Sequence, residues 1–239
     1  MARKPTRSTR RSKSGAAVPP LSGTDREKAI GALMALLARH PFEEIGLAEV
    51  AGRAGLSLSQ LRAEFGSVMA ILGAFTKDID RKVLDAETDE LEDAPARERL
   101  FDVLMRRIEA LAPYKDAIRS LLNSARHNPG LAMALNGMAL RSQRWMLTAA
   151  GIDANGPRGL LRIQGTALLF GRVMTIWTED DDESLDRTMA VLDRGLASAE
   201  RWSGLMDDLF CIPAMLCRGV SRRRRRRPLD EGPAEAEAA

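Results

Sequence analysis

The chain has 239 residues and contains few cysteines, histidines and aromatic residues. Its two cysteines, Cys211 and Cys217, do not form a C-x-x-C pair, which fits a reducing, cytoplasmic setting. His40 and His127 are the only histidines, so a histidine-rich metal site is excluded. One Tyr and six Phe, without alternating apolar and polar residues, disfavour a β-sheet protein. These shortages leave an all-α fold as the expected class.

Motifs for catalysis and nucleotide binding are also missing. The sequence has no G-x-G-x-x-G and no P-loop, and neither histidine has a Cys or Ser partner at a known catalytic spacing. The acidic stretch Asp180–Asp182 lacks the glycine and the distant Glu of a calcium loop, so we interpret it as a solvated loop before a helix. We therefore expect no enzyme activity, no catalytic residue, no metal site and no cofactor.

The basic residues are concentrated at the two ends of the chain, although the formal net charge is only +3. Of 36 Lys and Arg, thirteen lie in Met1–Ser14, at Arg218 and in Arg222–Arg227. Four of the 33 acids follow Pro228, so the part between the tails has 23 bases and 29 acids. The expected folded body is therefore acidic, and the basic character belongs to the tails.

Residues 1–23 are rich in Arg, Ser, Pro and Gly and lack a hydrophobic face, which predicts a disordered arm. Such an arm can follow DNA phosphates without reading sequence. A mitochondrial transit peptide has a similar composition, but it would also need an amphipathic stretch. The sequence has neither the apolar core of a signal peptide nor a run long enough to span a membrane.

A helix-turn-helix pattern occupies Leu47–Phe65. Val50, Ala51 and Ala54 share one face of a first helix, and Gly55 provides the left-handed residue that ends it. Ser57 and Gln60 form an S-x-x-Q capping box that starts a second helix. The second helix of such a unit normally enters the major groove of DNA. The alternative is an ordinary corner between two helices of an all-α protein.

The neighbouring residues extend this pattern. Thr24–Glu27 is a second capping box, and Ser67 precedes a long amphipathic segment that runs toward Asp85. This arrangement resembles the N-terminal domain of TetR/AcrR-type regulators. The matching residues are Ala29, Leu33, Leu37, Val50, Ala51, Ala54, Gly55, Leu56, Ser57, Leu61 and Phe65. The resemblance implies a TetR-like fold, a homodimer and DNA binding.

The second helix of the helix-turn-helix pattern and the residues after it depart from that family at positions that usually contact phosphates. Leu58, Arg62 and Glu64 stand where the family usually has Lys, Tyr and His, and Val68 stands in place of a Lys. Between Asp25 and Asp80 there are six bases and eight acids. A net-acidic head is unusual for a strong DNA binder, because phosphate neutralisation supplies much of the affinity.

The rest of the chain is expected to be helical, with breaks at Asn128–Gly130, Asn155–Pro157 and Glu179–Glu183. Its expected apolar faces include Leu135, Met138, Trp145 and Met146, then Leu160, Ile163, Ala167, Leu168, Phe170, Val173, Met174 and Trp177. Three stretches in this body resemble the lipid-binding accessory proteins of ubiquinone biosynthesis, which share the TetR fold. They are 96–122, 144–151 and 177–194.

The last part of the chain joins an apolar stretch to a basic run. Gly204–Arg218 is mostly apolar, and Arg222–Arg227 is polyarginine. This order suits the surface of an anionic membrane, to which each basic residue contributes about 1 kcal/mol. The alternative is a last helix packed on the body or on a second subunit, followed by a solvated tail. Pro213 would interrupt a regular helix.

The sequence thus predicts a basic arm (1–23), a helix-turn-helix head (24–85), a ligand-binding and dimerisation body (86–203) and a tail (204–239). The expected partners are operator DNA, a small apolar ligand or lipid, and a second copy of the chain. The candidate DNA-binding residues are Ser57, Leu58, Ser59, Gln60 and Arg62. The candidate pocket residues are Met138, Trp145, Phe170, Met174 and Trp177, although residues of this kind are more often plain core than pocket. The function expected first is a ligand-released repressor; the alternatives are a ubiquinone-type lipid accessory protein and a plain interaction module.

Overall fold

The computed structural model describes residues 23–86, 93–182 and 184–199, and all its regular elements there are helices. In order they are α1 (Asp25–Leu37), η1 (Phe42–Glu44), α2 (Leu47–Ala54), α3 (Leu58–Glu64), α4 (Val68–Leu84), α5 (Ala96–Leu111), η3 (Ala112–Tyr114), α6 (Lys115–His127), α7 (Pro129–Ala149) and α8 (Gly156–Glu179). Residues 186–199 are also helical. The all-α expectation is confirmed. The basic arm and the apolar and polyarginine tail lie outside the described residues.

The described chain divides into two compact units. The first contains α1 to α4, the end of α5 from Arg106, α6, and α7 up to Met146. The second contains the start of α5, the last residues of α7, α8 and the helix at 186–199. The division of the sequence into a head (24–85) and a body (86–203) stays a prediction, since α5 and α7 each contribute residues to both units.

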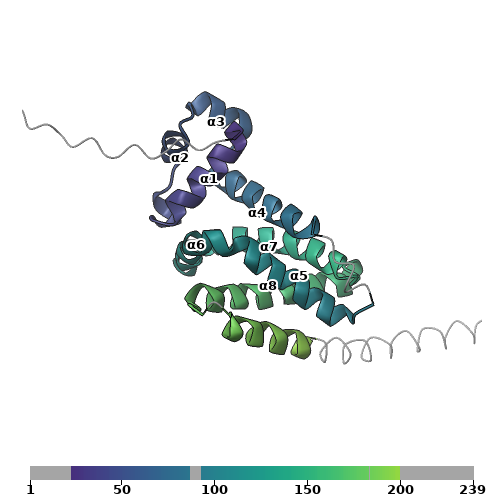
Figure 1. The fold of residues 1–239 in the computed structure, drawn as a ribbon. Coiled ribbons are helices and arrows are strands. Elements are labelled where there is room, and N and C mark those ends of the chain that lie inside the picture. Colours follow the sequence, from purple (N-terminus) through teal and green to yellow (C-terminus); the bar gives the residue numbers. More distant parts are fainter. Residues whose placement is uncertain (1–22, 87–92, 183, 200–239) are drawn as a thin grey trace, which may run out of the picture. The chain divides into compact units, whose positions relative to one another are not determined.

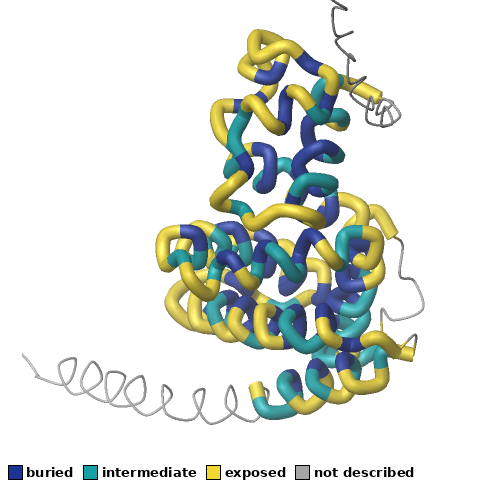
Figure 2. Tube along the Cα trace, turned by 90° about the vertical axis from the view of Figure 1, so that its left-hand side faces the viewer, coloured by how far each residue is buried: buried dark blue, intermediate teal, exposed yellow. Residues whose placement is uncertain are grey.

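Helices α1, α2 and α3 pack together at one end of the first unit, and α4 continues from them (Figure 1). The expected capping box starts α1, because Thr24 Oγ1 accepts a hydrogen bond from the Glu27 amide at 3.2 Å and Glu27 Oε2 accepts one from the Thr24 amide at 2.8 Å. The apolar residues predicted on α1, α2 and α4 are buried: Ile30, Leu33, Met34, Leu37, Val50, Ala51, Ala54, Ile71, Leu72, Phe75, Ile79 and Val83. Figure 2 shows these buried stretches alternating with exposed turns along each helix.

Helix α4 is fixed inside the first unit by polar contacts that the sequence patterns did not reveal. Asp80 is buried, and its Oδ1 accepts hydrogen bonds from Arg107 Nη1 of α5 and, at 2.8 Å, from Ser142 Oγ of α7. Arg106 Nη1 donates to the carbonyl oxygens of Val83 and Ala86, at 3.2 and 3.0 Å. These two bonds satisfy carbonyls that the end of a helix leaves without partners.

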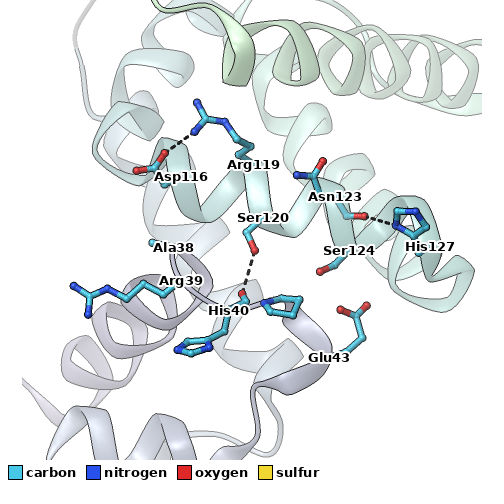
Figure 3. A pocket seen from close by; sticks show the side chains of 11 residues that line it. Ala38, Arg39, His40, Glu43, Asp116, Arg119, Ser120, Asn123, Ser124 and His127 are labelled. Carbon is cyan, nitrogen blue, oxygen red and sulfur yellow. Dashed lines mark hydrogen bonds and ion pairs between the residues drawn. The ribbon is translucent and has the colours of Figure 1, made fainter.

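The segment that follows α1 rests on α6, and a polar groove of about 530 Å³ lies beside this contact (Figure 3). Ser124 Oγ accepts a hydrogen bond from the Phe42 amide at 3.0 Å, and Ser120 Oγ donates to the His40 carbonyl at 3.1 Å. Glu43 accepts a bond from Asn128 Nδ2 at 3.3 Å. The two serine bonds satisfy backbone groups of the short segment between α1 and α2, and the bond from Asn128 joins two side chains.

Two predicted apolar faces are wrong in part. On α7, Trp145 is 58% exposed, whereas Met138 and Met146 are buried. On α8, Leu160 and Leu168 are exposed, whereas Ile163, Ala167, Phe170, Val173, Met174 and Trp177 are buried. A helix that is apolar on several sides cannot bury all of them against its own chain, and hydrophobicity alone does not say which side stays outside.

The expected breaks between helices are observed, with adjustments at two of them. Pro129 is the first residue of α7 rather than part of a break, and Asn128 Oδ1 caps that helix by accepting from the Leu131 amide at 3.0 Å. The acidic loop after α8 caps the next helix, because Asp180 Oδ2 accepts bonds from the amide and hydroxyl of Thr188, at 3.1 and 2.6 Å. Asp180 therefore lies before a helix as expected, but the expectation of a solvated loop is wrong for this residue, which is buried against Thr188.

The buried ion pair of α4 gives a stability prediction. Arg107→Ala should lower the free energy of unfolding by about 3–5 kcal/mol, because it leaves the Asp80 carboxylate buried without its cation. Urea unfolding followed by circular dichroism measures the change. Arg119→Ala is the matched control, since it removes a half-exposed guanidinium whose ion pair with Asp116 lies on the surface and should cost at most about 1 kcal/mol. Equal losses in the two variants would contradict the role given to the buried pair.

Candidate nucleic-acid interface

The turn between α2 and α3 is built as the sequence predicts. Gly55 has φ +70° and ψ +29°, a left-handed conformation that an L side chain would strain. The Leu56 amide then donates to the Ala51 carbonyl at 2.9 Å, and the Leu56 side chain is buried. The chain can therefore reverse within three residues and begin α3 at a fixed angle.

The capping box of α3 is present in both directions. Ser57 Oγ accepts a hydrogen bond from the Gln60 amide at 3.1 Å, and Gln60 Oε1 accepts one from the Ser57 amide at 3.0 Å. Below them, Leu61 and Phe65 are buried and anchor the helix to the core. Ser57, Leu58, Ser59, Gln60 and Arg62, the five candidate DNA-binding residues, are all exposed, and their role in binding DNA stays a prediction.

Gln60 has a second partner that sequence reasoning missed. Its Nε2 donates to Asp25 Oδ2 of α1 at 3.1 Å, although the two residues are 35 positions apart. Both polar atoms of the Gln60 side chain are therefore engaged within the protein. No local pattern could have revealed this contact, because it exists only once α1 and α3 are packed together.

Leu58 and Arg62, two of the other outward side chains, have different chemistry. Leu58 is 60% exposed and stands in the first turn of α3, the part of a reading helix that usually meets base edges. An apolar side chain there can contact the methyl group of thymine. Arg62 is exposed and makes no hydrogen bond or ion pair with any residue that the structure describes. Its guanidinium is free to donate to a base or a phosphate.

Two of the six basic residues between Asp25 and Asp80 are committed to carboxylates. Arg26 pairs with Asp78 of α4 through two hydrogen bonds of 2.8 Å, and this bonding raises the pKa of Arg26 against the opposing effect of burial. Lys28 lies 3.5 Å from Asp25. Within the described part of the chain, Arg39, Arg53, Arg62 and Lys77 form no ion pair. Together with the exposed Arg81 and Lys82, these four are the cations that the head can offer to phosphates.

The predicted pocket residues are divided between the two units. Met138 and Trp145 belong to the first unit, and Phe170, Met174 and Trp177 belong to the second. All except Trp145 are buried. The hypothesis that they line one ligand pocket stays a prediction.

The structure also describes two features that bear on other classes of protein. Nowhere in 23–86, 93–182 and 184–199 do three His, Cys, Asp or Glu side chains group as they would around a metal ion. No helix among these residues is long and apolar enough to cross a membrane.

The arrangement of helices matches solved structures of transcriptional regulators. A TetR transcriptional regulator from Nitrosomonas europaea aligns with a TM-score of 0.58 and 21% identity, over 74% of this chain and 99% of that one. A TetR-family transcriptional regulator from Streptomyces coelicolor aligns with a TM-score of 0.50 and 14% identity, over 82% and 99%. No family model and no curated protein sequence matches the chain. Together with the helix-turn-helix geometry, these alignments show that the chain has the fold of the TetR-type transcriptional regulators.

Proposed function

We propose that the protein is a cytoplasmic TetR-type transcriptional regulator that binds operator DNA as a homodimer through α3 and is released by a small apolar ligand. The observation that carries the proposal is the exposed side of α3. The exposed side chains there are those of Ser57, Leu58, Ser59, Gln60 and Arg62. The helix itself is held by its capping box and by the buried Leu61 and Phe65. A helix held in this way can enter the major groove without reorganising.

In this proposal Leu58 and Arg62 contact the bases. The contribution of Gln60 depends on its bond to Asp25. Arg62 can donate to the N7 and O6 atoms of guanine, and Leu58 can pack on a thymine methyl. Asp25 already accepts one of the two Nε2 hydrogens of Gln60, so the amide has only one donor left for a base while this bond persists. The bond to Asp25 therefore lowers the affinity that Gln60 can contribute.

The acidic balance of the head requires phosphate contacts from elsewhere. Arg39, Arg53, Lys77, Arg81 and Lys82 are the other basic residues of the described head that form no ion pair. Met1–Ser14 adds six Lys and Arg without an acid. We infer that this arm supplies the larger share of the sequence-independent affinity, because each neutralised phosphate releases counterions.

Exposed leucines on α8 support the homodimer. Leu160, Leu161 and Leu168 are 59%, 57% and 64% exposed, and their spacing of seven to eight residues places them along one side of the helix. A group of large apolar side chains left in water marks an interaction surface. In a two-fold dimer the same surface of each subunit meets its copy.

Support for the ligand comes from the chemistry of α7 and α8. Gln143 is almost fully buried, and no residue of the described chain donates a hydrogen bond to its Oε1. A buried acceptor without a partner is costly, and a donor group on a bound molecule would satisfy it. Phe170, Met174 and Trp177 provide an apolar face along α8. Gln143 belongs to the first unit and these three residues belong to the second, so we infer only that the ligand is apolar where it contacts α8.

The first test of this function selects DNA from a random pool with the purified full-length protein. We expect enrichment of a two-fold symmetric site whose half-sites lie about one helical turn, or a multiple of it, apart. Arg62→Ala should weaken binding to that site by at least about tenfold, since a good base contact contributes roughly 1–3 kcal/mol. Arg119→Ala removes an arginine of α6 and should leave the affinity unchanged. A wild-type protein that enriches no sequence would refute the operator hypothesis.

Gln60 is tested separately, because it also caps α3. Gln60→Ala should lower the unfolding midpoint as well as the DNA affinity, whereas Asp25→Ala should leave the capping box intact and release the Gln60 amide group. We expect Asp25→Ala to bind the selected site more tightly than wild type, in gel-shift titrations at fixed salt. Unchanged affinity in Asp25→Ala would mean that Gln60 acts as a cap and does not read bases.

The arm gives a prediction about salt. Deletion of Met1–Ser14 should weaken binding to all DNA sequences alike. It should also make the dependence of the logarithm of the binding constant on the logarithm of salt concentration shallower, by about 0.9 per lost phosphate contact. Titrations of specific and unrelated DNA at several salt concentrations measure both effects. A changed sequence preference with an unchanged salt slope would show instead that the arm reads bases.

A further inference from the structure

A second groove, of about 540 Å³, lies within the second unit between α5 and the helix at 186–199. Phe101 of α5 lines it opposite Met189 and Ala190. One ion pair crosses between the two helices, from Arg97 Nη2 to Asp193 Oδ1 at 2.6 Å. The ion pair therefore joins the two helices that form the groove, and Phe101, Met189 and Ala190 provide its apolar lining.

The margin of this groove is acidic. Glu98, Asp102 and Asp193 contribute three carboxylates, and Arg97 contributes one guanidinium, so the lining carries two net negative charges. An occupant that matches the lining must combine apolar side chains with positive charge. Neither a free hydrocarbon nor an acidic peptide meets both requirements.

The chain itself contains such a segment immediately after the described residues. Leu205–Leu216 is apolar apart from Asp207, Asp208 and Pro213, and its positive charge comes only from the residues that follow it, Arg218 and Arg222–Arg227. We propose that Leu205–Leu216 of the same chain docks in the groove between α5 and the helix at 186–199, with the following arginines beside the acidic margin. This inference goes beyond the regulator function and does not depend on it.

The chain is long enough for this contact. Met189 and Asp193 lie ten and six residues before residue 199, which corresponds to roughly 15 and 9 Å along the helix. The five residues 200–204 can span at most about 18 Å. Twelve residues, Leu205–Leu216, then reach back along the groove in any backbone conformation, because even the compact rise of a helix gives them about 18 Å.

Because Leu205–Leu216 belongs to the same chain as the groove, it is favoured over a binding partner from solution. A segment joined to the groove through a short linker has an effective concentration in the millimolar range, so weak apolar contacts suffice to keep it bound. The docked state would hold the polyarginine run beside the body. The same run would otherwise be available to DNA phosphates or to an anionic membrane.

The natural cysteines provide the test, because Cys211 lies in the proposed segment and the described residues contain no cysteine. In the full-length Cys217→Ser protein, Ala190→Cys places a thiol in the groove and Arg172→Cys places one on the exposed side of α8. After mild oxidation at micromolar protein, peptide mass spectrometry should find the intramolecular Cys211 disulfide at least tenfold more often with Ala190→Cys. A disulfide forms only when the two Cα atoms approach within about 7 Å.

Equal yields at the two positions would overturn the proposal. So would cross-links that form mainly between molecules and disappear on dilution, since these would show that a second copy occupies the groove. Either result leaves the DNA selection unaffected, so this proposal and the regulator function can fail separately.

A second measurement does not depend on disulfide geometry. The rate at which a maleimide labels Cys211 in the Cys217→Ser protein should rise severalfold in Glu98→Lys, which reverses a charge of the groove. Glu179→Lys makes the same charge change at an exposed position outside it and should leave the rate unchanged. If Glu98→Lys has no effect and vesicles of phosphatidylcholine with phosphatidylserine slow the labelling instead, the segment binds membranes and the groove proposal is wrong.

Discussion

The first unit depends on how α4 is held. This helix begins directly after the helix-turn-helix and ends among α5 and α7, where Arg107 and Ser142 bind the buried Asp80 and Arg106 binds the last carbonyls. A buried ion pair adds little net stability compared with a well-packed apolar pair, but separating its partners leaves an uncompensated charge in the interior. The pair therefore disfavours any packing in which α4 slides along or turns against α5. It keeps α4, which directly follows α3 in the chain, in one position.

The surface of α3 shows how one side chain can serve both folding and recognition. Gln60 closes the capping box with Ser57 and also donates to Asp25, so its amide holds α3 both to its own first turn and to α1. A base contact by Gln60 would have to use the remaining Nε2 hydrogen or replace the second of these bonds. Arg62 and Leu58 have no such competing hydrogen bond with a described residue, so they can meet DNA in the conformation that they already have.

Charge is distributed unevenly between the folded part of this chain and its ends. Arg26 and Lys28 of the head are committed to nearby carboxylates. The thirteen basic residues of the tails are the largest reserve of positive charge, and they include the six of Met1–Ser14 and the run Arg222–Arg227. Where the tails bind therefore decides how strongly the protein attracts polyanions. An arm on DNA and a C-terminal segment in an acidic groove would have opposite effects on that attraction.

The sequence by itself determined the features that arise from neighbours along the chain. Capping boxes, the left-handed Gly55 and the spacing of apolar residues depend on atoms only a few residues apart, so the helices, the turn and the exposed side of α3 could be predicted. Only the tertiary structure decided which sides of α7 and α8 are covered, and it left Trp145 and Leu168 in solvent. It also created the contacts of Asp80 with Arg107 and of Gln60 with Asp25, because residues 27 and 35 positions apart meet only when separate helices pack.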